Sequence, residues 1–309
     1  MATRDLTLPV TAPFRLDFTA WALRRRQANV VDRWARGRYT RALVGNTGAV
    51  TVTISQQATG TAPALVVNLQ SDHRLTGQLP VEVRLLVQKM FGLDVDLGPF
   101  YALAQDNPVL ASLVEQFAGL RPPRFPTIFE ALVNAIACQQ VSLDSGIASL
   151  NRLSETFGMQ VADGDNRICA FPRPVDLAEA GEGSIRGLGF SQQKARAIKE
   201  LARAVAADRL DLVKLEQLSN EDVVACLSEI RGIGRWSSEY VLLRGLGRLD
   251  IFPADDVGAQ NNLQRLFRLD RKPSYGEINA LVAPWSPYQG LVYFHLLLEK
   301  LWLKGVLDR

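Results

Sequence analysis

A glycine-rich turn and a pair of aspartates stand a short distance apart in the sequence, and their residue types suit chemistry on a charged polymer. Gly232 and Gly234 bracket one apolar residue, so the backbone can turn tightly there. A turn that opens into a helix leaves free N–H groups at the helix start, and such groups bind phosphate oxygens. Asp255 and Asp256 stand where a further helix is predicted to begin. The pattern predicts a site that binds a nucleic-acid backbone and places a carboxylate beside it.

Asp256 is the residue predicted to do the chemistry. When an N-glycosidic bond breaks, the sugar becomes cation-like, and a fixed carboxylate beside it stabilises that charge and orients water. The start of the following helix favours the ionised carboxylate. Asp255 is expected to cap that helix. The alternative is that both aspartates serve only as helix caps.

The longer string around these residues resembles a known family. It reads Leu-x-x-Ile-x-Gly-Ile-Gly-x-Trp-Ser-x-x-Tyr over 227–240, followed by Phe-Pro-x-Asp-Asp over 252–256. This string is similar to that of the helix-hairpin-helix DNA glycosylases, and most of all to the AlkA type, 3-methyladenine DNA glycosylase II. The resemblance extends over nearly the whole chain and is strongest from Pro126 to Trp302.

The resemblance implies a monofunctional DNA glycosylase whose partner is double-stranded DNA with damaged bases. Its substrates would be flipped-out alkylated purines, chiefly 3-methyladenine, with 7-methylguanine as a further candidate. Bifunctional relatives place a nucleophilic lysine just after the hairpin, where this sequence has Trp236, so no lyase activity is expected. Two alternatives stay open: a glycosylase for deaminated or oxidised bases, and a non-catalytic module that binds lesions in DNA.

An aromatic base pocket is a second implication of the resemblance. Trp236 and Tyr240 stand one helical turn apart, so one helix face carries both, and they match the family's pocket residues. Electron-rich rings attract the positive charge of an alkylated purine. Phe294 is the predicted third aromatic residue, with Tyr293 as the alternative by one register step. Each of these rings could instead belong to the core.

DNA contacts are expected in two places. The hairpin matches the family's backbone-binding element, with the residues Arg231, Gly232, Ile233, Gly234 and Arg235. Gln139 and Gln140 match the segment that faces the minor groove, where Gln140 would fill the gap left by the extruded nucleotide; alternatively, both only cap a helix end. In the family, hairpin carbonyl oxygens also coordinate a monovalent cation. The backbone of 231–234 is therefore a candidate Na⁺ or K⁺ site.

Composition limits the other possibilities. The chain has 309 residues, and 47% of them are hydrophobic. Its formal net charge is only +3, so the net charge by itself does not indicate a DNA partner. Cys138, Cys169 and Cys226 lack the spacing of a side-chain metal site, and they are too few for the four-cysteine iron–sulfur cluster of some relatives. No cofactor is expected beyond the hairpin cation. The absence of a signal peptide and of a membrane-spanning run favours a cytoplasmic protein, associated with the nucleoid when on DNA and expected to be a monomer.

The fold predicted to position these residues is α+β. Residues 1–100 are expected to form an N-terminal mixed α/β subdomain, TBP-like by the resemblance. Residues 101–309 are expected to form a two-lobed, all-helical glycosylase body, with the helix-hairpin-helix at about 221–245. The site should lie in the cleft between the lobes.

Within the N-terminal part, hydrophobic patterns predict individual elements. Strands are expected at 14–18, 39–44, 49–54 and 64–69, with a turn at 45–48, and helices at 20–34 and 80–91. Arg24, Arg25 and Arg26 are predicted to form a solvated helix face, with phosphate contact as the alternative. Lys194, after a second glycine turn at 186–190, is expected to be exposed to solvent, with phosphate contact as the alternative.

Overall fold

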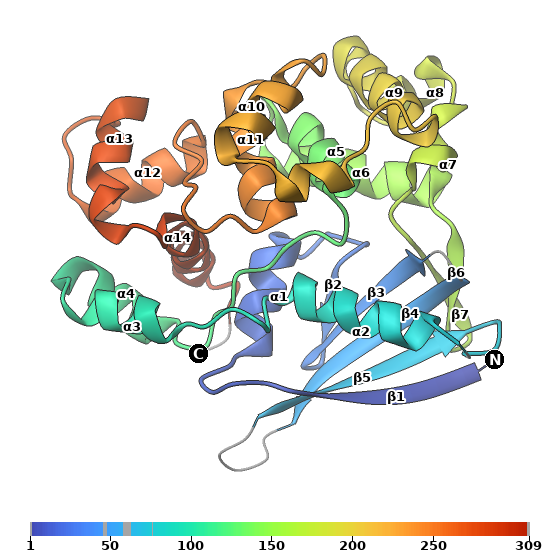
Figure 1. The fold of residues 1–309 in the computed structure, drawn as a ribbon, viewed down its shortest axis with the longest axis horizontal. Coiled ribbons are helices and arrows are strands. Elements are labelled where there is room, and N and C mark those ends of the chain that lie inside the picture. Colours follow the sequence, from blue (N-terminus) through green and yellow to red (C-terminus); the bar gives the residue numbers. More distant parts are fainter. Residues whose placement is uncertain (1, 46–47, 58–62, 76, 308–309) are drawn as a thin grey trace.

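A five-stranded antiparallel sheet forms the N-terminal part of the computed structural model, which describes residues 2–45, 48–57, 63–75 and 77–307 (Figure 1). The strand order is β1-β5-β4-β3-β2. In β5, alternate residues are buried, so Leu65, Val67 and Leu69 share the core face. The strands are β1 (Ala2–Pro9), β2 (Arg33–Ala35), β3 (Arg38–Gly45), β4 (Gly48–Gln57) and β5 (Ala64–Ser71).

The predicted hairpin at 39–54, the strand at 64–69 and the helix at 80–91 are confirmed. They correspond to β3–β4, to β5 and to α2 (Leu79–Met90). Two residues of the predicted turn, 46 and 47, lie outside the described residues. Strand β1 was not predicted, because most of its side chains are exposed at the sheet edge and carry no strong hydrophobic alternation.

The predictions for the next segment are wrong. Helix α1 runs from Leu16 to Arg24, so the strand expected at 14–18 does not form and the helix expected at 20–34 ends early. Arg25 takes a left-handed backbone conformation with φ of 61°, which terminates the helix. The Arg24 guanidinium then donates to the carbonyl oxygens of Arg26, Gln27 and Trp34, so the following chain winds around it.

Helices dominate the rest of the chain. They are α3 (Gly98–Gln105), α4 (Pro108–Gln116), α5 (Ile128–Cys138), α6 (Leu143–Phe157), α7 (Pro174–Ala178), α8 (Glu182–Gly187), α9 (Gln192–Ala206), α10 (Asn220–Ser228), α11 (Arg235–Val241), α12 (Val257–Leu266), α13 (Tyr275–Val282) and α14 (Gln289–Leu303). A two-stranded hairpin, β6 (Gln160–Asp163) and β7 (Asn166–Cys169), interrupts them. The prediction of an all-helical body is therefore wrong at this hairpin.

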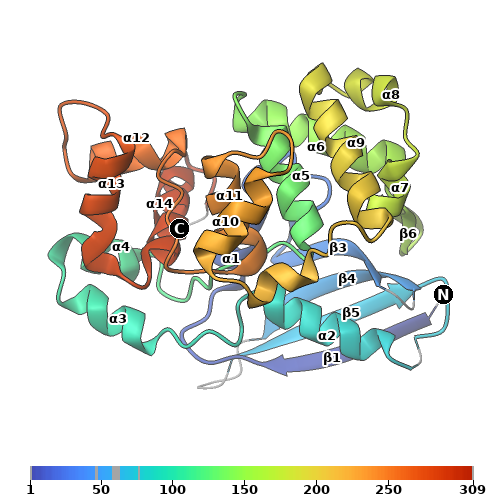
Figure 2. The ribbon, with the colours of Figure 1, turned by 45° about the horizontal axis from the view of Figure 1, so that its top comes forward.

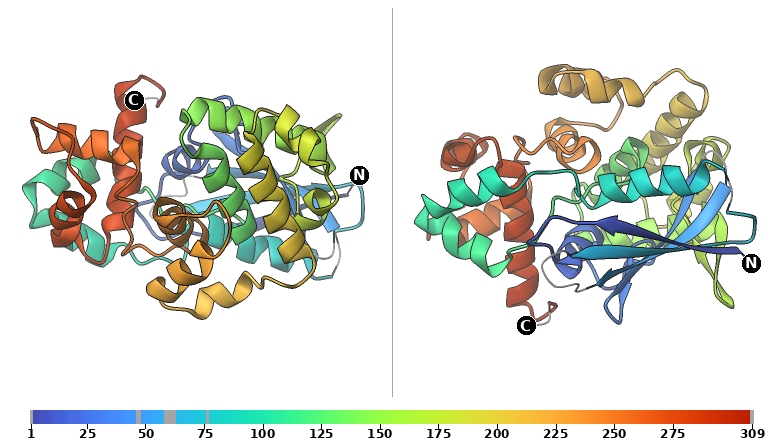
Figure 3. Two further views of the ribbon diagram at one scale, coloured as in Figure 1. Left: turned by 90° about the horizontal axis from the view of Figure 1, so that it is seen from above. Right: turned by 60° about the horizontal axis from the view of Figure 1, so that its bottom comes forward.

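Among the described residues there are two large hydrophobic cores, and a small third cluster includes Ala42, Val161 and Ile168. The first joins the sheet and α2 to α5, α6 and α9–α11. The second joins α3 and α4 to α12, α13 and α14. Figures 2 and 3 show the two helical groups side by side, with the sheet under the first group. Helix α1 contributes to both, with Leu23 in the first core and Trp21 in the second, so it lies at their junction.

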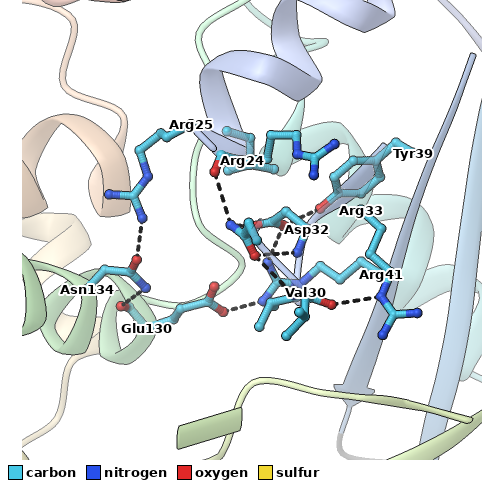
Figure 4. A network of polar contacts seen from close by, with 12 residues as sticks. Arg24, Arg25, Val30, Asp32, Arg33, Tyr39, Arg41, Glu130 and Asn134 are labelled. Atoms are coloured by element: carbon cyan, nitrogen blue, oxygen red, sulfur yellow. Dashed lines mark hydrogen bonds and ion pairs between the residues drawn. The ribbon is translucent and has the colours of Figure 1, made fainter. Parts of the chain in front are cut away.

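A buried charge network fastens the sheet to helix α5 (Figure 4). Arg41 on β3 is 2% exposed and donates to Asp32 at 2.7 Å and to Glu130 on α5 at 2.5 Å. Tyr39 donates a further hydrogen bond to Asp32. Burial raises the pKa of the Glu130 carboxyl, and the Arg41 guanidinium counteracts this. The network holds the N-terminal part and the helical body in one arrangement.

Candidate active site

A cavity of about 920 Å³ lies between two lobes of the molecule, which are the segments built around the first core and those built around the second. We call it the central cavity. Its walls come from the loop after α1, the α5–α6 loop, the start of α11, the start of α12 and one face of α14. Residues from these five segments that line it include Arg25, Gln140, Trp236, Tyr240, Asp256, Tyr293 and Lys300. The predicted acid and two of the predicted aromatic residues therefore meet in one place.

Asp256 is both the N-cap of α12 and a wall of the cavity. Its Oδ1 accepts a hydrogen bond from the Ala259 N–H at 2.8 Å. Its Oδ2 lies 3.4 Å from Trp236 Nε1 and 3.5 Å from the Tyr293 hydroxyl. The helix N-terminus stabilises negative charge, and the half-buried carboxylate keeps one oxygen directed toward the aromatic side of the cavity.

Asp255 was predicted to cap helix α12, and this prediction is wrong. Its Oδ2 accepts a hydrogen bond from Arg235 Nε at 2.8 Å, which ties the start of α11 to the start of α12. The Arg235 guanidinium also lies 3.9 Å from the centre of the Tyr275 ring. The cap belongs to Asp256 because its Oδ1 reaches the N–H of the third residue beyond it.

Trp236 and Tyr240 lie together on α11, as predicted, with ring centres 5.5 Å apart. The Tyr240 hydroxyl is buried and accepts a hydrogen bond from Arg25 at 2.8 Å. Burial raises the pKa of Tyr240 above its ordinary value, so the phenol stays protonated at neutral pH. Arg25 thus supplies a positive charge behind an aromatic wall.

The prediction of Phe294 as the third pocket aromatic is wrong in register. Phe294 is fully buried in the second core, where the Arg244 guanidinium lies 5.2 Å from its ring centre. Tyr293, one residue earlier on α14, lines the cavity instead. Consecutive helical residues point about 100° apart, so one register step separates the cavity wall from the core.

The prediction that Arg24, Arg25 and Arg26, at the end of α1, form a solvated helix face is wrong. Arg24 and Arg25 are 3% and 4% exposed. Arg25 donates to Asn134 Oδ1 at 2.6 Å as well as to Tyr240, so it links α5 to the cavity (Figure 4). Arg26 pairs with Asp144 at the start of α6. The sequence missed these roles because the helix was predicted to continue through them.

The hairpin between α10 and α11 adopts a tight turn, with φ of 86° at Gly232. Arg231, Gly232, Gly234 and Arg235 are exposed, whereas the Ile233 side chain is buried. The Ile233 side chain therefore cannot reach DNA, and this residue could contribute only backbone atoms. Gly234 and Arg235 also line the central cavity, so the hairpin borders the acid.

Two side chains near the hairpin behave differently from the predictions. Gln139 directs its amide inward and donates to Gly232 O and Ser237 Oγ. Lys194 is not free in solvent, because its ammonium donates to the carbonyl oxygens of Ala137 and Gln139. Burial lowers the pKa of Lys194. Gln140, by contrast, is exposed at the cavity rim.

Lys300 lines the cavity although the sequence did not single it out. A Cβ placed on Gly258 would lie 2.9 Å from Asp256 Oδ1 and 3.8 Å from Lys300 Nζ, so these two charged groups approach the same glycine. Burial and then the neighbouring charge of Lys304 lower the pKa of Lys300. Tyr293, Leu297 and Lys300 follow a helical spacing along α14. That spacing is the signal that could have identified this wall.

Within the described residues, no group of three histidine, cysteine or acidic side chains could hold a metal ion. The three cysteines are free thiols. In the same part of the chain, no helix has the length and hydrophobicity needed to cross a membrane.

Comparison with known proteins places this site in a family context. Residues 133–287 match the model of the HhH-GPD superfamily base excision DNA repair proteins, and residues 5–126 match the AlkA N-terminal domain. A DNA-3-methyladenine glycosylase of Bacillus subtilis is 32% identical over 70% of this chain and 71% of its own length. DNA-3-methyladenine glycosylase 2 of Escherichia coli is 27% identical over 96% of this chain and 98% of its own.

Solved structures share the fold. The 3-methyladenine DNA-glycosylase from Archaeoglobus fulgidus superposes with a TM-score of 0.85 over 96% of this chain and 98% of its own, at 22% identity. The 8-oxoguanine glycosylase/lyase of Clostridium acetobutylicum, bound to double-stranded DNA, gives a TM-score of 0.73 over 94% of this chain and 93% of its own, at 18% identity. With a family model that matches half of its length, an N-terminal domain of the AlkA type, and this fold, the chain belongs to the HhH-GPD superfamily of base excision DNA repair proteins.

Proposed function

We propose that this protein is a DNA glycosylase that releases alkylated purines, 3-methyladenine above all and 7-methylguanine in addition, from double-stranded DNA. One observation carries the proposal: the Asp256 carboxylate faces a cavity with aromatic walls, at the border of a hairpin suited to holding a DNA strand. The names of the relatives from Bacillus subtilis and Escherichia coli agree with this substrate class. All of these groups come from one chain, so we propose that the protein acts as a monomer.

In the proposed reaction, aromatic rings bind the base and the Asp256 carboxylate stabilises the sugar. An extruded purine enters the central cavity and contacts the rings of Trp236 and Tyr293, which attract its positive charge. As the N-glycosidic bond breaks, both bonding electrons leave with the base, which becomes neutral, and positive charge develops on the sugar. Asp256 Oδ2 stabilises that charge. Water then adds to C1′ and gives its proton to the Asp256 carboxylate, which releases it to solvent, and an abasic site remains.

The same arrangement supports hydrolysis without strand cleavage. A lyase needs an amine that attacks C1′ and forms a Schiff base. The residue beside the acid on α11 is Trp236, whose indole N–H points at Asp256 Oδ2 and has no nucleophilic lone pair. Lys300, which approaches from α14, is the amine to test. We expect borohydride to trap no protein–DNA adduct; an adduct that Lys300→Met abolishes would contradict the monofunctional assignment.

A monovalent cation at the hairpin is part of the proposal. Of the four carbonyl oxygens at 231–234, that of Gly232 accepts a hydrogen bond from Gln139 and that of Gly234 accepts one from the Ser238 N–H. The carbonyl oxygens of Arg231 and Ile233 accept none from the described residues. These two would hold a Na⁺ or K⁺ ion, whose charge would attract a DNA phosphate.

Base release from a panel of damaged duplexes tests the substrate class. The duplexes carry 3-methyladenine, 7-methylguanine, a deaminated purine or an oxidised purine, and the free base is quantified by chromatography. We expect release of 3-methyladenine to be fastest. Release of only the deaminated or oxidised base would refute the alkylated-purine assignment, and binding without any release would refute a catalytic function.

A further inference from the structure

The loop between α5 and α6 carries an exposed tip at the rim of the central cavity. Gln140 is exposed and has a left-handed backbone conformation, with φ of 51°. Val141 follows and is 46% exposed, and both residues line the cavity. We call Gln140 and Val141 the loop tip. An exposed valine beside a polar side chain suits insertion between stacked bases.

One side of this loop is fastened to the hairpin. The Gln139 side-chain amide donates to Gly232 O at 2.7 Å and to Ser237 Oγ at 2.8 Å. An amide NH₂ has two protons, and these two acceptors use both. Gln139 therefore has no N–H left for a DNA base or phosphate, and it connects the residue before the tip to the element that would hold the DNA backbone.

The same side of the loop, before the tip, is also fastened to α9. Lys194 Nζ donates to Ala137 O at 3.0 Å and to Gln139 O at 2.6 Å. The last turn of a helix leaves carbonyl oxygens without partners, and its negative end favours a cation. An ammonium from another helix thus completes the end of α5, immediately before the tip.

Helix α9 also contacts the hairpin directly. A Cβ placed on Gly232 would lie 3.3 Å from the Ala197 Cβ, so the hairpin glycine approaches α9 closely. Lys194 and Ala197 stand three residues apart and share one face of α9. The end of α5, the hairpin and α9 therefore meet pairwise, and each pair is joined by a direct contact.

We infer that Gln139 and Lys194 are positioning residues that brace the loop tip against the hairpin, so that the strand grip and the inserted tip move as one body. The inference rests on the proposed function and assigns Gln139 to this brace, where direct DNA contact had been predicted. Extruding a nucleotide costs free energy of unstacking. A tip that had to be ordered at the moment of insertion would add an entropic cost to this. The brace removes that cost before DNA binds.

The test separates insertion from backbone grip. Dissociation constants are measured for a duplex with a tetrahydrofuran abasic analogue, where the tip can insert, and for the undamaged duplex of the same sequence. Lys194→Met and Gln139→Leu should each weaken binding to the abasic duplex about tenfold, as loss of charge-assisted or paired hydrogen bonds implies. Binding to the undamaged duplex should not change, because the brace acts only through the inserted tip.

Three matched variants complete the design. Lys199→Met removes the same charge from another face of α9 and should bind both duplexes as the parent does. Lys194→Arg keeps a charged donor and should restore most of the preference for the abasic duplex. Gln140→Ala removes the tip side chain, and adding Lys194→Met to it should cost little more, because the brace acts through the tip.

Two results would overturn the inference. The first is a Lys194→Met or Gln139→Leu protein that keeps the parental preference for the abasic duplex. The second is a parallel loss on both duplexes, which would show a damaged fold or a lost phosphate contact. A parental protein without any preference for the abasic duplex would overturn the proposed function together with the brace, so the two failures are distinguishable.

Discussion

Tyr293 and Phe294 show how much a single residue step matters in this site. The Tyr293 hydroxyl lies 3.5 Å from Asp256 Oδ2, whereas Phe294 is enclosed in the second core. Tyr293→Phe should therefore lower the single-turnover rate of base release, by roughly fivefold for about 1 kcal/mol of lost polar contact, without a change in melting temperature.

Phe294→Leu should affect stability instead of the rate of base release. It removes buried ring atoms, so we expect it to reduce the free energy of unfolding by about 1 to 2 kcal/mol while the rate of base release stays near the parental value. Denaturant unfolding and single-turnover kinetics on both variants check this pair of predictions. A rate loss in Phe294→Leu larger than that in Tyr293→Phe would contradict the assignment of Tyr293 to the cavity wall.

His295 gives the molecule a pH-dependent stability. It is 1% exposed, and burial lowers its pKa from 6.5 to about 4. The unfolded chain binds this proton more readily than the folded chain between pH 6.5 and 4, so the contribution to stability is lost as the pH falls through that window. The loss amounts to about 3 kcal/mol at most, at about 1.4 kcal/mol per pKa unit.

Comparison with His295→Leu isolates this effect, because other titrating groups such as Glu130 remain in both proteins. The parent should lose more unfolding free energy than the variant between pH 7 and pH 4. Equal pH profiles for the two proteins would show that His295 titrates normally in the folded state.

At the scale of elements, strong local signals were predicted well. Thr127 is of a residue type that favours helix N-caps, and its hydroxyl accepts a hydrogen bond from the Glu130 N–H at the start of α5. The glycine hairpin and the helices on either side of it were also predicted, because glycine spacing and hydrophobic periodicity are local properties. Helix α12 begins one residue after Asp256, where the aspartate pair indicated a helix start.

Several features were missed because they depend on side-chain contacts that no hydrophobic pattern indicates. Helix α1 ends at Arg25, which takes a left-handed conformation, and the Arg24 guanidinium donates to carbonyl oxygens of the loop that follows. Lys194 is held by the end of α5, and no local pattern around it indicates this. The choice between Asp255 and Asp256 as the cap was likewise decided by a distant partner, Arg235. Local sequence predicts where most elements form, but polar contacts decide where α1 ends and which partners hold Lys194 and Asp255.

At the scale of the whole molecule, Arg41 is the main polar connection between the sheet and α5. Arg41→Met would leave the carboxylates of Asp32 and Glu130 buried without their cation. We expect a loss of about 3 to 5 kcal/mol in the free energy of unfolding, measured by denaturant titration. Arg38→Met, at an exposed position on the same strand, is the matched control and should change stability little. Equal effects of the two substitutions would contradict the buried network.

The N-terminal part also reaches the cavity itself. Arg25 follows α1 and donates to Tyr240 on α11 and to Asn134 on α5. Because α1 contributes to both hydrophobic cores, it fixes Arg25 at the junction of the two lobes. The sheet domain is therefore part of the architecture of the site, and its connection runs through Glu130 and Asn134 (Figure 4).

The central claim is that the charge of Asp256, separate from its role as a helix cap, drives base release. Asn is as good an N-cap as Asp, so Asp256→Asn should preserve α12 and the cavity while it removes the charge. The decisive measurement is the single-turnover rate of 3-methyladenine release by this variant, alongside its affinity for an abasic-analogue duplex. We expect the rate to fall by a factor of about 10² to 10³ or more, with affinity near the parental value. Release at the parental rate would contradict the account.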